Sequence, residues 1–237
     1  MTGSQWLRLA ALIALVLTHP PGASRGADPA THPAATRPGP FRIACCGDSM
    51  TKMPYDKAYP EQLGKLLGDG YDVRNFGHNG VTALRDSGRP FWKMPEFEAA
   101  NAFEPNLVIV MLGTNDAANT ADVWQQFHDD LLWLVKHFQS LPSRPRVVVM
   151  TPPPLMPGYP KGESRLANLR DKVSPLVRKL AEEQKLTLVE LQTEPALADA
   201  ALYPDKVHVN EAGAKIVAQR VCETLGLGTA PTSQPAR

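Results

Sequence analysis

Apolar positions follow two patterns that alternate along the chain from residue 41 to residue 227. The first pattern consists of short, nearly continuous apolar runs rich in β-prone residues, which is typical of strands buried on both faces. These runs occupy residues 41–46, 71–76, 106–112, 146–150 and 186–191. In the second pattern apolar residues recur at helical spacing. It predicts helices over residues 59–67, 123–138, 164–185 and 210–225.

Two of the predicted helices contain residues that define an end or a change of direction. Asn210 is a favoured N-cap residue, and Glu211 in the first turn complements the helix dipole. Pro175 lies inside the segment 164–185 and lacks a backbone N–H, so we expect it to kink that helix.

Five buried strands separated by helices predict one α/β domain over residues 41–227, with a five-stranded parallel sheet and helices on both faces. Ligands of such sheets bind at the carboxyl ends of the strands. Functional residues are therefore expected in the turns that directly follow the predicted strands.

Composition agrees with a single globular domain, since 43% of the 237 residues are apolar and 21% are charged. The formal net charge is +1, and the chain has no basic run. A nucleic-acid-binding protein is expected to present a strongly basic surface, so we predict no nucleic-acid partner.

The two ends of the chain differ from the middle. Residues 1–26 combine Arg8, a short apolar stretch and small residues, which is the layout of a secretory signal peptide. We predict cleavage near Gly26 or Ala27 and export to the periplasm or the medium, without membrane attachment afterwards. An uncleaved membrane anchor is the alternative. Residues 27–40 predict a disordered linker, and residues 228–237 a disordered tail.

The chain has three cysteines, Cys45, Cys46 and Cys222. Adjacent cysteines rarely bridge each other, so Cys45 and Cys46 are interpreted as small core residues. A bridge from one of them to Cys222 stays open. The Cys and His spacings match no zinc motif, and we predict neither a metal nor another cofactor.

Glycines and short polar residues follow the first three predicted strands. The first exit turn is Gly47-Asp48-Ser49, the second runs from Gly77 to Gly80, and the third is Gly113-Thr114-Asn115-Asp116. A single such turn is weak evidence, because turns favour these residues anyway. Three consecutive turns of this kind, with Asp205 and His208 before the last helix, point to a catalytic crevice.

The chemistry of these residues predicts a hydrolytic triad. Ser49 supplies a hydroxyl nucleophile, His208 accepts its proton, and Asp205, three residues before His208, orients the imidazole ring. The backbone N–H groups of Ser49 and Gly80 and the amide of Asn115 are the predicted oxyanion-hole donors. We expect the reaction rate to rise with pH as His208 loses its proton, because only neutral imidazole acts as a base.

In their order along the chain, these blocks resemble those of the SGNH hydrolases, the GDSL-type esterase and lipase superfamily. The resemblance implies a three-layer, flavodoxin-like fold and ester hydrolysis by Ser49 without a metal. Two departures from the family pattern are visible. Met50 stands where the named motif has Leu, and His78-Asn79 precedes Gly80 where many relatives have Ser.

Four further residues are predicted to contact substrate: Asp48, His78, Asn79 and Trp92. Each also has a structural interpretation that stays open. Asp48 is suited to accepting backbone hydrogen bonds within its turn, His78 and Asn79 to an ordinary loop, and Trp92 to core packing. The proline-rich segment 151–162 is interpreted either as a wall of the cleft or as a stiff connector.

Three functions are compatible with these residues. The first is a secreted esterase that removes O-acetyl groups from a carbohydrate, acting on a small-molecule or polysaccharide ester. The second is a lysophospholipase or thioesterase for longer acyl chains. The third is a binding module without catalysis, which the full set of catalytic groups disfavours. The sequence leaves the oligomeric state open.

Overall fold

The computed structural model describes residues 39–54, 57–159 and 162–227. The predicted signal peptide (1–26), residues 27–38 of the predicted linker and the predicted tail (228–237) lie outside the described residues. Within the described part of the chain, no helix has the length and apolar character needed to cross a membrane.

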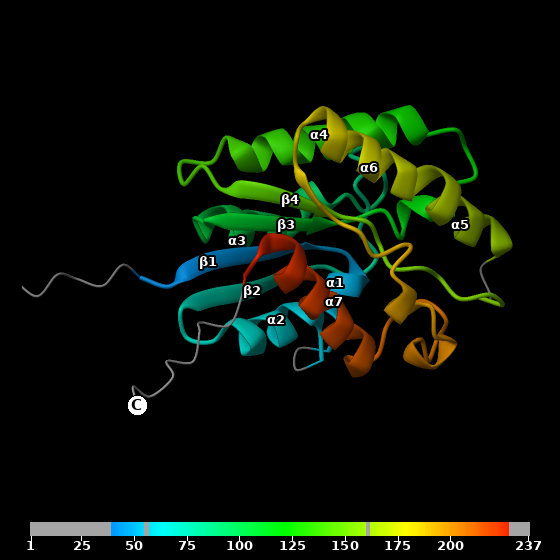
Figure 1. The fold of residues 1–237 in the computed structure, drawn as a ribbon. Coiled ribbons are helices and arrows are strands. Elements are labelled where there is room, and N and C mark those ends of the chain that lie inside the picture. Colours follow the sequence, from blue (N-terminus) through cyan, green and yellow to red (C-terminus); the bar gives the residue numbers. More distant parts are fainter. Residues whose placement is uncertain (1–38, 55–56, 160–161, 228–237) are drawn as a thin grey trace, which may run out of the picture. The chain divides into compact units, whose positions relative to one another are not determined.

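The centre of the domain is a five-stranded, fully parallel sheet with the strand order β2-β1-β3-β4-β5 (Figure 1). The strands are β1 (Phe41–Gly47), β2 (Tyr71–Gly77), β3 (Leu107–Met111), β4 (Arg146–Met150) and β5 (Thr187–Val189). All five predicted strands are therefore confirmed, although β5 is shorter than the apolar run 186–191. All five residues of the central strand β3 are buried, which explains its continuous apolar sequence.

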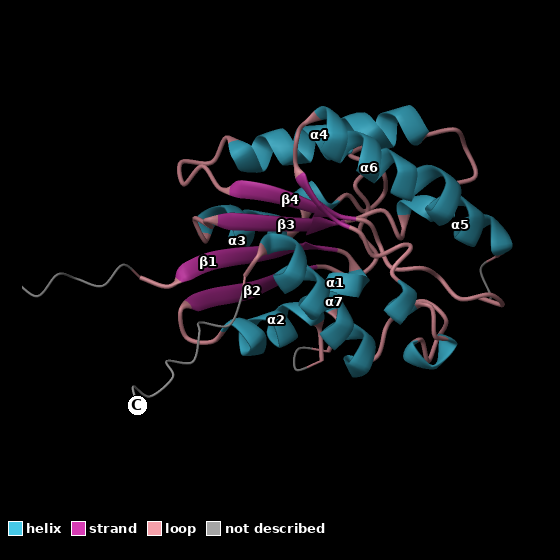
Figure 2. Cartoon of the chain, viewed as in Figure 1, coloured by secondary structure: helices cyan, strands magenta, loops and turns pink. Residues whose placement is uncertain are grey.

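Helices cover both faces of this sheet (Figure 2). They are α1 (Ser49–Lys52), α2 (Tyr59–Leu67), α3 (Pro95–Ala102), α4 (Trp124–Gln139), α5 (Glu163–Asn168), α6 (Ser174–Glu183) and α7 (Glu211–Leu225). Helix α2 packs beside α7, and α4 packs beside α6. Phe97 of α3 contacts Trp133 and Phe138 of α4, so α3 and α4 share an aromatic cluster. The predicted α/β fold with helices on both faces is confirmed.

The predicted helix over residues 164–185 is interrupted. Helix α5 passes into a π-helical turn at Leu169–Val173, and α6 continues from Ser174. The π-helical turn lies directly before Pro175, which has no N–H to donate to the preceding turn. The proline therefore coincides with a change in helix type at this point.

The last helix begins and ends as its sequence predicts. The Asn210 side chain accepts a hydrogen bond from the Gly213 N–H at 3.1 Å, and Gly226 ends the helix in a left-handed conformation with φ +62°. Cys45 and Cys46 are fully buried in β1, Cys222 is partly buried, and all three thiols are free. The core interpretation of the two adjacent cysteines is thus confirmed, and the bridge to Cys222 does not form.

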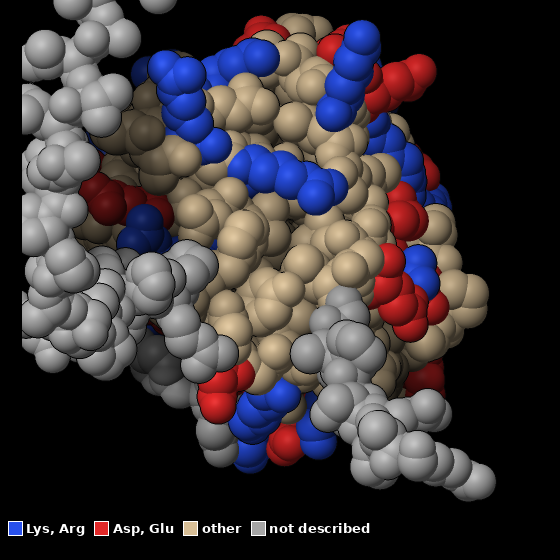
Figure 3. Space-filling view, turned by 60° about the vertical axis from the view of Figure 1, so that its left-hand side comes forward, with Lys and Arg blue, Asp and Glu red and all other residues tan. Residues whose placement is uncertain are grey.

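Figure 3 shows the side of the domain where the amino ends of the strands lie. Lys and Arg side chains and Asp and Glu side chains both occur on this face, in keeping with the net charge of +1. The glycine-containing turns lie at the opposite, carboxyl ends of the strands, where the site is described next.

Candidate active site

Close packing at the carboxyl edge of the sheet brings the exit turns together. Gly47, the last residue of β1, is paired with Gly77 of β2 and Met111 of β3. A Cβ atom at Gly47 would lie 2.2 Å from the Thr51 Oγ1 atom and 2.5 Å from the Met111 carbonyl oxygen. Only glycine allows α1 to turn across the strand ends at this distance.

Ser49 is the first residue of α1 and lies at the end of a chain of hydrogen bonds. The Ser49 Oγ atom is 2.8 Å from His208 Nε2, although the two residues are 159 positions apart. His208 Nδ1 is 2.6 Å from Asp205 Oδ2. A neutral ring with its proton on Nδ1 donates to Asp205 and leaves Nε2 to accept the Ser49 hydroxyl proton. The structure thus brings together the three residues predicted as a triad.

Asp205 is held by its own loop as well as by the imidazole. Its Oδ1 atom accepts hydrogen bonds from the backbone N–H groups of His208 at 2.7 Å and Val207 at 3.0 Å. Partial burial raises the pKa of Asp205, but the hydrogen bonds from His208 and Val207 outweigh it, and the pKa is lowered overall. Asp205 therefore stays ionised and fixes the tautomer of His208.

The three predicted oxyanion-hole donors surround the same space. Gly80 has a φ of +75°, which glycine adopts without strain. The N–H groups of Ser49 and Gly80 donate to no other residue that the structure describes. The Asn115 amide nitrogen donates to the Val81 carbonyl oxygen at 2.8 Å, and its second hydrogen is left for a ligand.

A pocket of about 820 Å³ opens beside these groups. Its lining residues are Ser49, Lys52, Met53, Pro54, Asn79, Gly80, Arg89, Asn115, Tyr159, Arg165, Asp205, Val207 and His208. All of the predicted catalytic and oxyanion-hole residues are in this set. Of the four predicted substrate contacts, only Asn79 is, and its contact with substrate remains a prediction. Tyr159 belongs to the proline-rich segment 151–162, which therefore contributes to the pocket wall.

Asp48 lies outside the pocket lining, which corrects its predicted role as a substrate contact. Its side chain is fully buried, and its Oδ1 atom accepts the Met50 N–H at 2.9 Å at the start of α1. Burial raises the pKa of Asp48 to about 6, against the lowering effect of the Met50 hydrogen bond. The structural interpretation of Asp48, as a residue that stabilises its turn, applies.

Trp92 and His78 also lie outside the pocket lining, which corrects their predicted role. The Trp92 ring packs edge-to-face against Trp133, and its Nε1–H donates to the Arg85 carbonyl oxygen at 3.2 Å. His78 Nδ1 pairs with Glu96 of α3 at 2.8 Å. The aromatic residue is used for packing, and the histidine for holding its loop.

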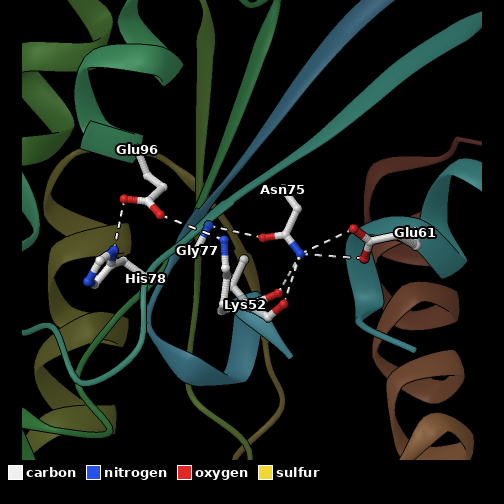
Figure 4. A network of polar contacts seen from close by, with 7 residues as sticks. Lys52, Glu61, Asn75, Gly77, His78 and Glu96 are labelled. Carbon is white, nitrogen blue, oxygen red and sulfur yellow. Dashed lines mark hydrogen bonds and ion pairs between the residues drawn. The ribbon is translucent and has the colours of Figure 1, made fainter. Parts of the chain in front are cut away.

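The His78 contact belongs to a network that joins two functional turns (Figure 4). Glu96 lies between His78, in the turn that contains Gly80, and Lys52 of α1, whose Nζ atom is 3.7 Å from the second Glu96 oxygen. Burial raises the pKa of Glu96, but the His78 hydrogen bond, a backbone hydrogen bond and the nearby charges of His78 and Lys52 together lower the pKa overall. Glu96 thereby connects the two turns that contain the predicted backbone oxyanion donors.

Asn75 of β2 makes a second connection between the same turns (Figure 4). Its amide nitrogen donates to the carbonyl oxygens of Thr51 at 2.9 Å and Lys52 at 3.3 Å, and its oxygen accepts the Gly77 N–H at 3.0 Å. The amide nitrogen also contacts the Glu61 carboxylate. The position of Ser49 relative to Gly80 is therefore set by partly buried side chains as well as by the sheet.

Asp116 stabilises the third turn in a similar way. Its two carboxylate oxygens accept the N–H groups of Leu84 at 3.0 Å and Ala83 at 3.1 Å, in the loop after β2. Complete burial raises the pKa of Asp116 to about 7, despite these two hydrogen bonds. The turn with Asn115 is thus attached to the loop that follows Gly80.

Sequence reasoning missed Arg165, which is buried at the start of α5. It donates to the Thr114 carbonyl oxygen at 2.9 Å, to Tyr159 Oη at 3.0 Å and to Asn115 Oδ1 at 3.0 Å. One signal was available, because Arg165, Leu169 and Val173 recur at a spacing of four and so share a helix face. That face is the buried one.

Within the part of the chain that the structure describes, no group of three or more His, Cys, Asp or Glu side chains could hold a metal ion. The groups that the structure brings together at the site are an acid-base chain and hydrogen-bond donors. This arrangement can activate a hydroxyl for attack on a carbonyl group and stabilise the resulting negative charge.

Residues 45–216 match the model of the GDSL-like Lipase/Acylhydrolase family. An acetylxylan esterase from Xylanibacter ruminicola is 28% identical over 210 residues, which cover 78% of this chain and 43% of that protein. The chain therefore spans less than half the length of this relative.

Solved structures share the fold. The structure of Axe2, an acetylxylan esterase from Geobacillus stearothermophilus, superposes with a TM-score of 0.62 at 23% identity, covering 79% of this chain and 95% of that one. An acetyl xylan esterase called AlAXEase superposes with a TM-score of 0.63 at 18% identity, covering 78% of this chain and 99% of that one. The three-layer arrangement implied by the sequence resemblance agrees with these structures.

Proposed function

The chain belongs to the GDSL-like lipase/acylhydrolase family, and we propose that it is an exported serine esterase that removes O-acetyl groups from a carbohydrate. One observation carries the catalytic part of this proposal. The hydrogen-bond chain from Asp205 through His208 ends at the Ser49 hydroxyl, which lies on the wall of a pocket that Gly80 also lines. The Gly80 N–H has no acceptor among the described residues.

The proposed reaction begins when His208 Nε2 accepts the Ser49 proton as Oγ bonds to the ester carbonyl carbon. The carbonyl electron pair moves to the oxygen, where the N–H groups of Ser49, Gly80 and Asn115 stabilise the negative charge. The bond to the sugar oxygen then breaks, and His208 returns the proton to the leaving alcohol. Water, deprotonated by His208, cleaves the acyl-enzyme, releases acetate and restores Ser49.

The acetyl group and the sugar alcohol are proposed from similarity and from the lining of the pocket. Acetylxylan esterases are among the similar proteins in both comparisons. Lys52, Asn79, Arg89 and Tyr159 line the pocket, and their side chains can hydrogen-bond a hydroxyl-rich ligand. These features support a carbohydrate ester as the substrate.

Export is proposed from the sequence of residues 1–26, which has the layout of a signal peptide. Expression of the full chain in a secreting host, followed by amino-terminal sequencing of the exported protein, tests it. We expect the mature protein to begin near residue 27. Retention of the full chain in the cell, or in the membrane, would contradict the proposal.

A second candidate is a lysophospholipase or thioesterase for longer acyl chains. Met53, Pro54 and Val207 give the pocket an apolar part. Met53 and Pro54 also line a neighbouring pocket, so that apolar surface continues past the catalytic one. A long acyl chain lying against these residues would explain this feature.

A series of 4-nitrophenyl esters from acetyl to dodecanoyl, together with acetylated xylan, separates these candidates. We expect the highest kcat/KM with acetyl and release of acetate from the polysaccharide. A preference for octanoyl or longer chains would replace the proposal with the second candidate. Failure of the wild-type protein to hydrolyse any ester would favour a binding module.

Ser49→Ala tests the nucleophile, with Ser140→Ala as the matched control because Ser140 is exposed on the far end of α4. We expect Ser49→Ala to lower kcat by at least about 10³-fold and Ser140→Ala to leave it unchanged. Undiminished hydrolysis by Ser49→Ala would rule out the proposed mechanism.

A further inference from the structure

Arg165 is a buried cation whose hydrogen-bond acceptors are all neutral. Only 7% of the residue is exposed, and its three nitrogen atoms bond to the Thr114 carbonyl, the Tyr159 hydroxyl and the Asn115 amide oxygen. The buried Asp48 carboxyl interacts with the guanidinium electrostatically, but no carboxylate of the described residues hydrogen-bonds to it. Removing a charge from water without an opposite charge bonded to it is costly. A glutamine or an apolar residue would fill this place without burying a charge, so a specific use of the guanidinium is expected.

The contacts of Asn115 show what the guanidinium does. The Asn115 oxygen accepts from Arg165 at 3.0 Å, and the nitrogen donates to the Val81 carbonyl at 2.8 Å. Reversing the amide would place its NH₂ against the guanidinium and its oxygen against a carbonyl, which removes both hydrogen bonds. Arg165 and Val81 together therefore permit one orientation only, in which an N–H remains available to the pocket.

Arg165 also holds the backbone next to this amide. Its Nε–H donates to the Thr114 carbonyl oxygen, one residue before Asn115, so the guanidinium contacts the third exit turn at two adjacent points. Its other terminal nitrogen bonds to Tyr159, which lines the pocket from the proline-rich segment. The planar fork of arginine makes these three contacts at once, whereas a lysine ammonium cannot reproduce the geometry.

We propose that Arg165 is a positioning residue for the oxyanion hole: it fixes the Asn115 amide so that an N–H faces the negative charge of the tetrahedral intermediate. The positive charge on the far side of the amide also strengthens Asn115 as a donor, because a charge-assisted hydrogen bond polarises it. This inference rests on the proposed ester hydrolysis. It concerns stabilisation of the transition state, so it predicts an effect on kcat more than on KM.

The test compares Arg165→Gln and Arg165→Lys with the control Arg170→Gln. Arg170 is exposed in the next turn and pairs only with its neighbour Asp171 at 2.7 Å among the contacts of the described residues. With 4-nitrophenyl acetate we expect Arg165→Gln to lower kcat about 10- to 100-fold with KM changed less than about threefold. Arg165→Lys should recover only part of the loss, and Arg170→Gln should match the wild type.

Combining each variant with Asn115→Ala separates positioning from a general effect on the fold. If Arg165 acts through Asn115, then Arg165→Gln should cost less than about threefold when Asn115 is already alanine. If the double variant lost activity by the full product of the two single losses, the inference would be overturned. Thermal unfolding is recorded for each variant, and if Arg165→Gln is unfolded, the same cycle is read with Arg165→Lys, which keeps the charge.

The inference and the proposed function fail in different ways. Activity that survives Ser49→Ala would remove the proposed mechanism. Loss of activity in Ser49→Ala, together with wild-type kcat in both Arg165 variants, would remove only the role of Arg165. A change confined to KM would also overturn it, because it would indicate that Arg165 binds the substrate in its ground state.

Discussion

Asp205 exposes 56% of its side chain on the segment before α7, whereas Asp48 and Asp116, in the turns after β1 and β3, are completely buried. All three carboxyl groups belong to the same site. The pKa of Asp205 is lowered, while burial raises the pKa of Asp48 to about 6 and that of Asp116 to about 7.

The difference follows from what surrounds each carboxylate. Asp205 accepts from an imidazole and two backbone N–H groups at a solvated edge, so its charged form is favoured. Among the described residues, the Asp116 carboxylate accepts hydrogen bonds from two backbone N–H groups and is completely buried, so desolvation dominates. Position beside the proposed nucleophile therefore does not identify the carboxyl that orients the imidazole. The donors to a carboxyl and its exposure do.

The largest expected effect comes from the imidazole that Asp205 serves. His208→Ala should lower kcat by several orders of magnitude, about 10³- to 10⁶-fold, because Ser49 loses its base. Lys206→Asn is the control, since Lys206 is exposed and its positive φ of 67° suits asparagine. Steady-state rates on 4-nitrophenyl acetate measure both. A His208→Ala rate within tenfold of the wild type would show that the segment with Asp205 and His208 is not catalytic.

A smaller loss is expected from Asp205→Ala, about 10- to 10²-fold in kcat. The His208 ring keeps its contact with Ser49 but loses the acceptor that holds its tautomer. Asp116→Asn should reduce kcat less than Asp205→Ala. If Asp116→Asn caused the larger loss, the division between a catalytic and a structural carboxyl would be reversed.

The last effect concerns stability and its dependence on pH, with little change in activity expected. Burial raises the pKa of Asp116 from 3.8 to about 7 in the folded state, so the folded protein holds a proton that the unfolded chain releases. This contribution to stability is complete below pH 3.8 and is lost as the pH rises through about 7, by at most about 1.4 kcal/mol per pH unit.

Urea unfolding of the wild type and Asp116→Asn at several values between pH 4 and pH 7.5 measures it. We expect the free energy of unfolding of the wild type to fall with rising pH relative to that of Asp116→Asn. If the free energies of unfolding of the two proteins changed in parallel with pH, Asp116 would be ionised in the folded state, as Asp205 is. That result would remove the contrast between the solvent-exposed Asp205 and the buried Asp116.

Much of the fold and of the catalytic set could be predicted from local sequence patterns. Continuous apolar runs identify buried parallel strands, and the order of parallel strands and helices places their exit turns at one edge. Ser49, Gly80, Asn115, Asp205 and His208 could be chosen because the chemistry requires those residue types at strand ends. The structure brings them into one pocket.

The tertiary structure alone decided which polar residues face that pocket and which support it. Asp48, His78 and Trp92 stand in the same turns and loops as residues that line the pocket. Asp48 bonds within its own turn, whereas His78 bonds to Glu96 and Trp92 to the Arg85 carbonyl oxygen, which are contacts made by folding. Arg165 reaches Asn115 across 50 residues, and nothing local to either residue indicates that contact.

The physical reason is the range of the interactions. Strand and helix periodicity, capping and turn chemistry depend on neighbours within a few residues, so the sequence by itself determined the order of elements and the candidate catalytic groups. Burial, hydrogen-bond partners and pKa shifts depend on segments that meet only after folding. The tertiary structure therefore decided the opposite protonation behaviour of Asp205 and Asp116 and the setting of Asn115 by Arg165.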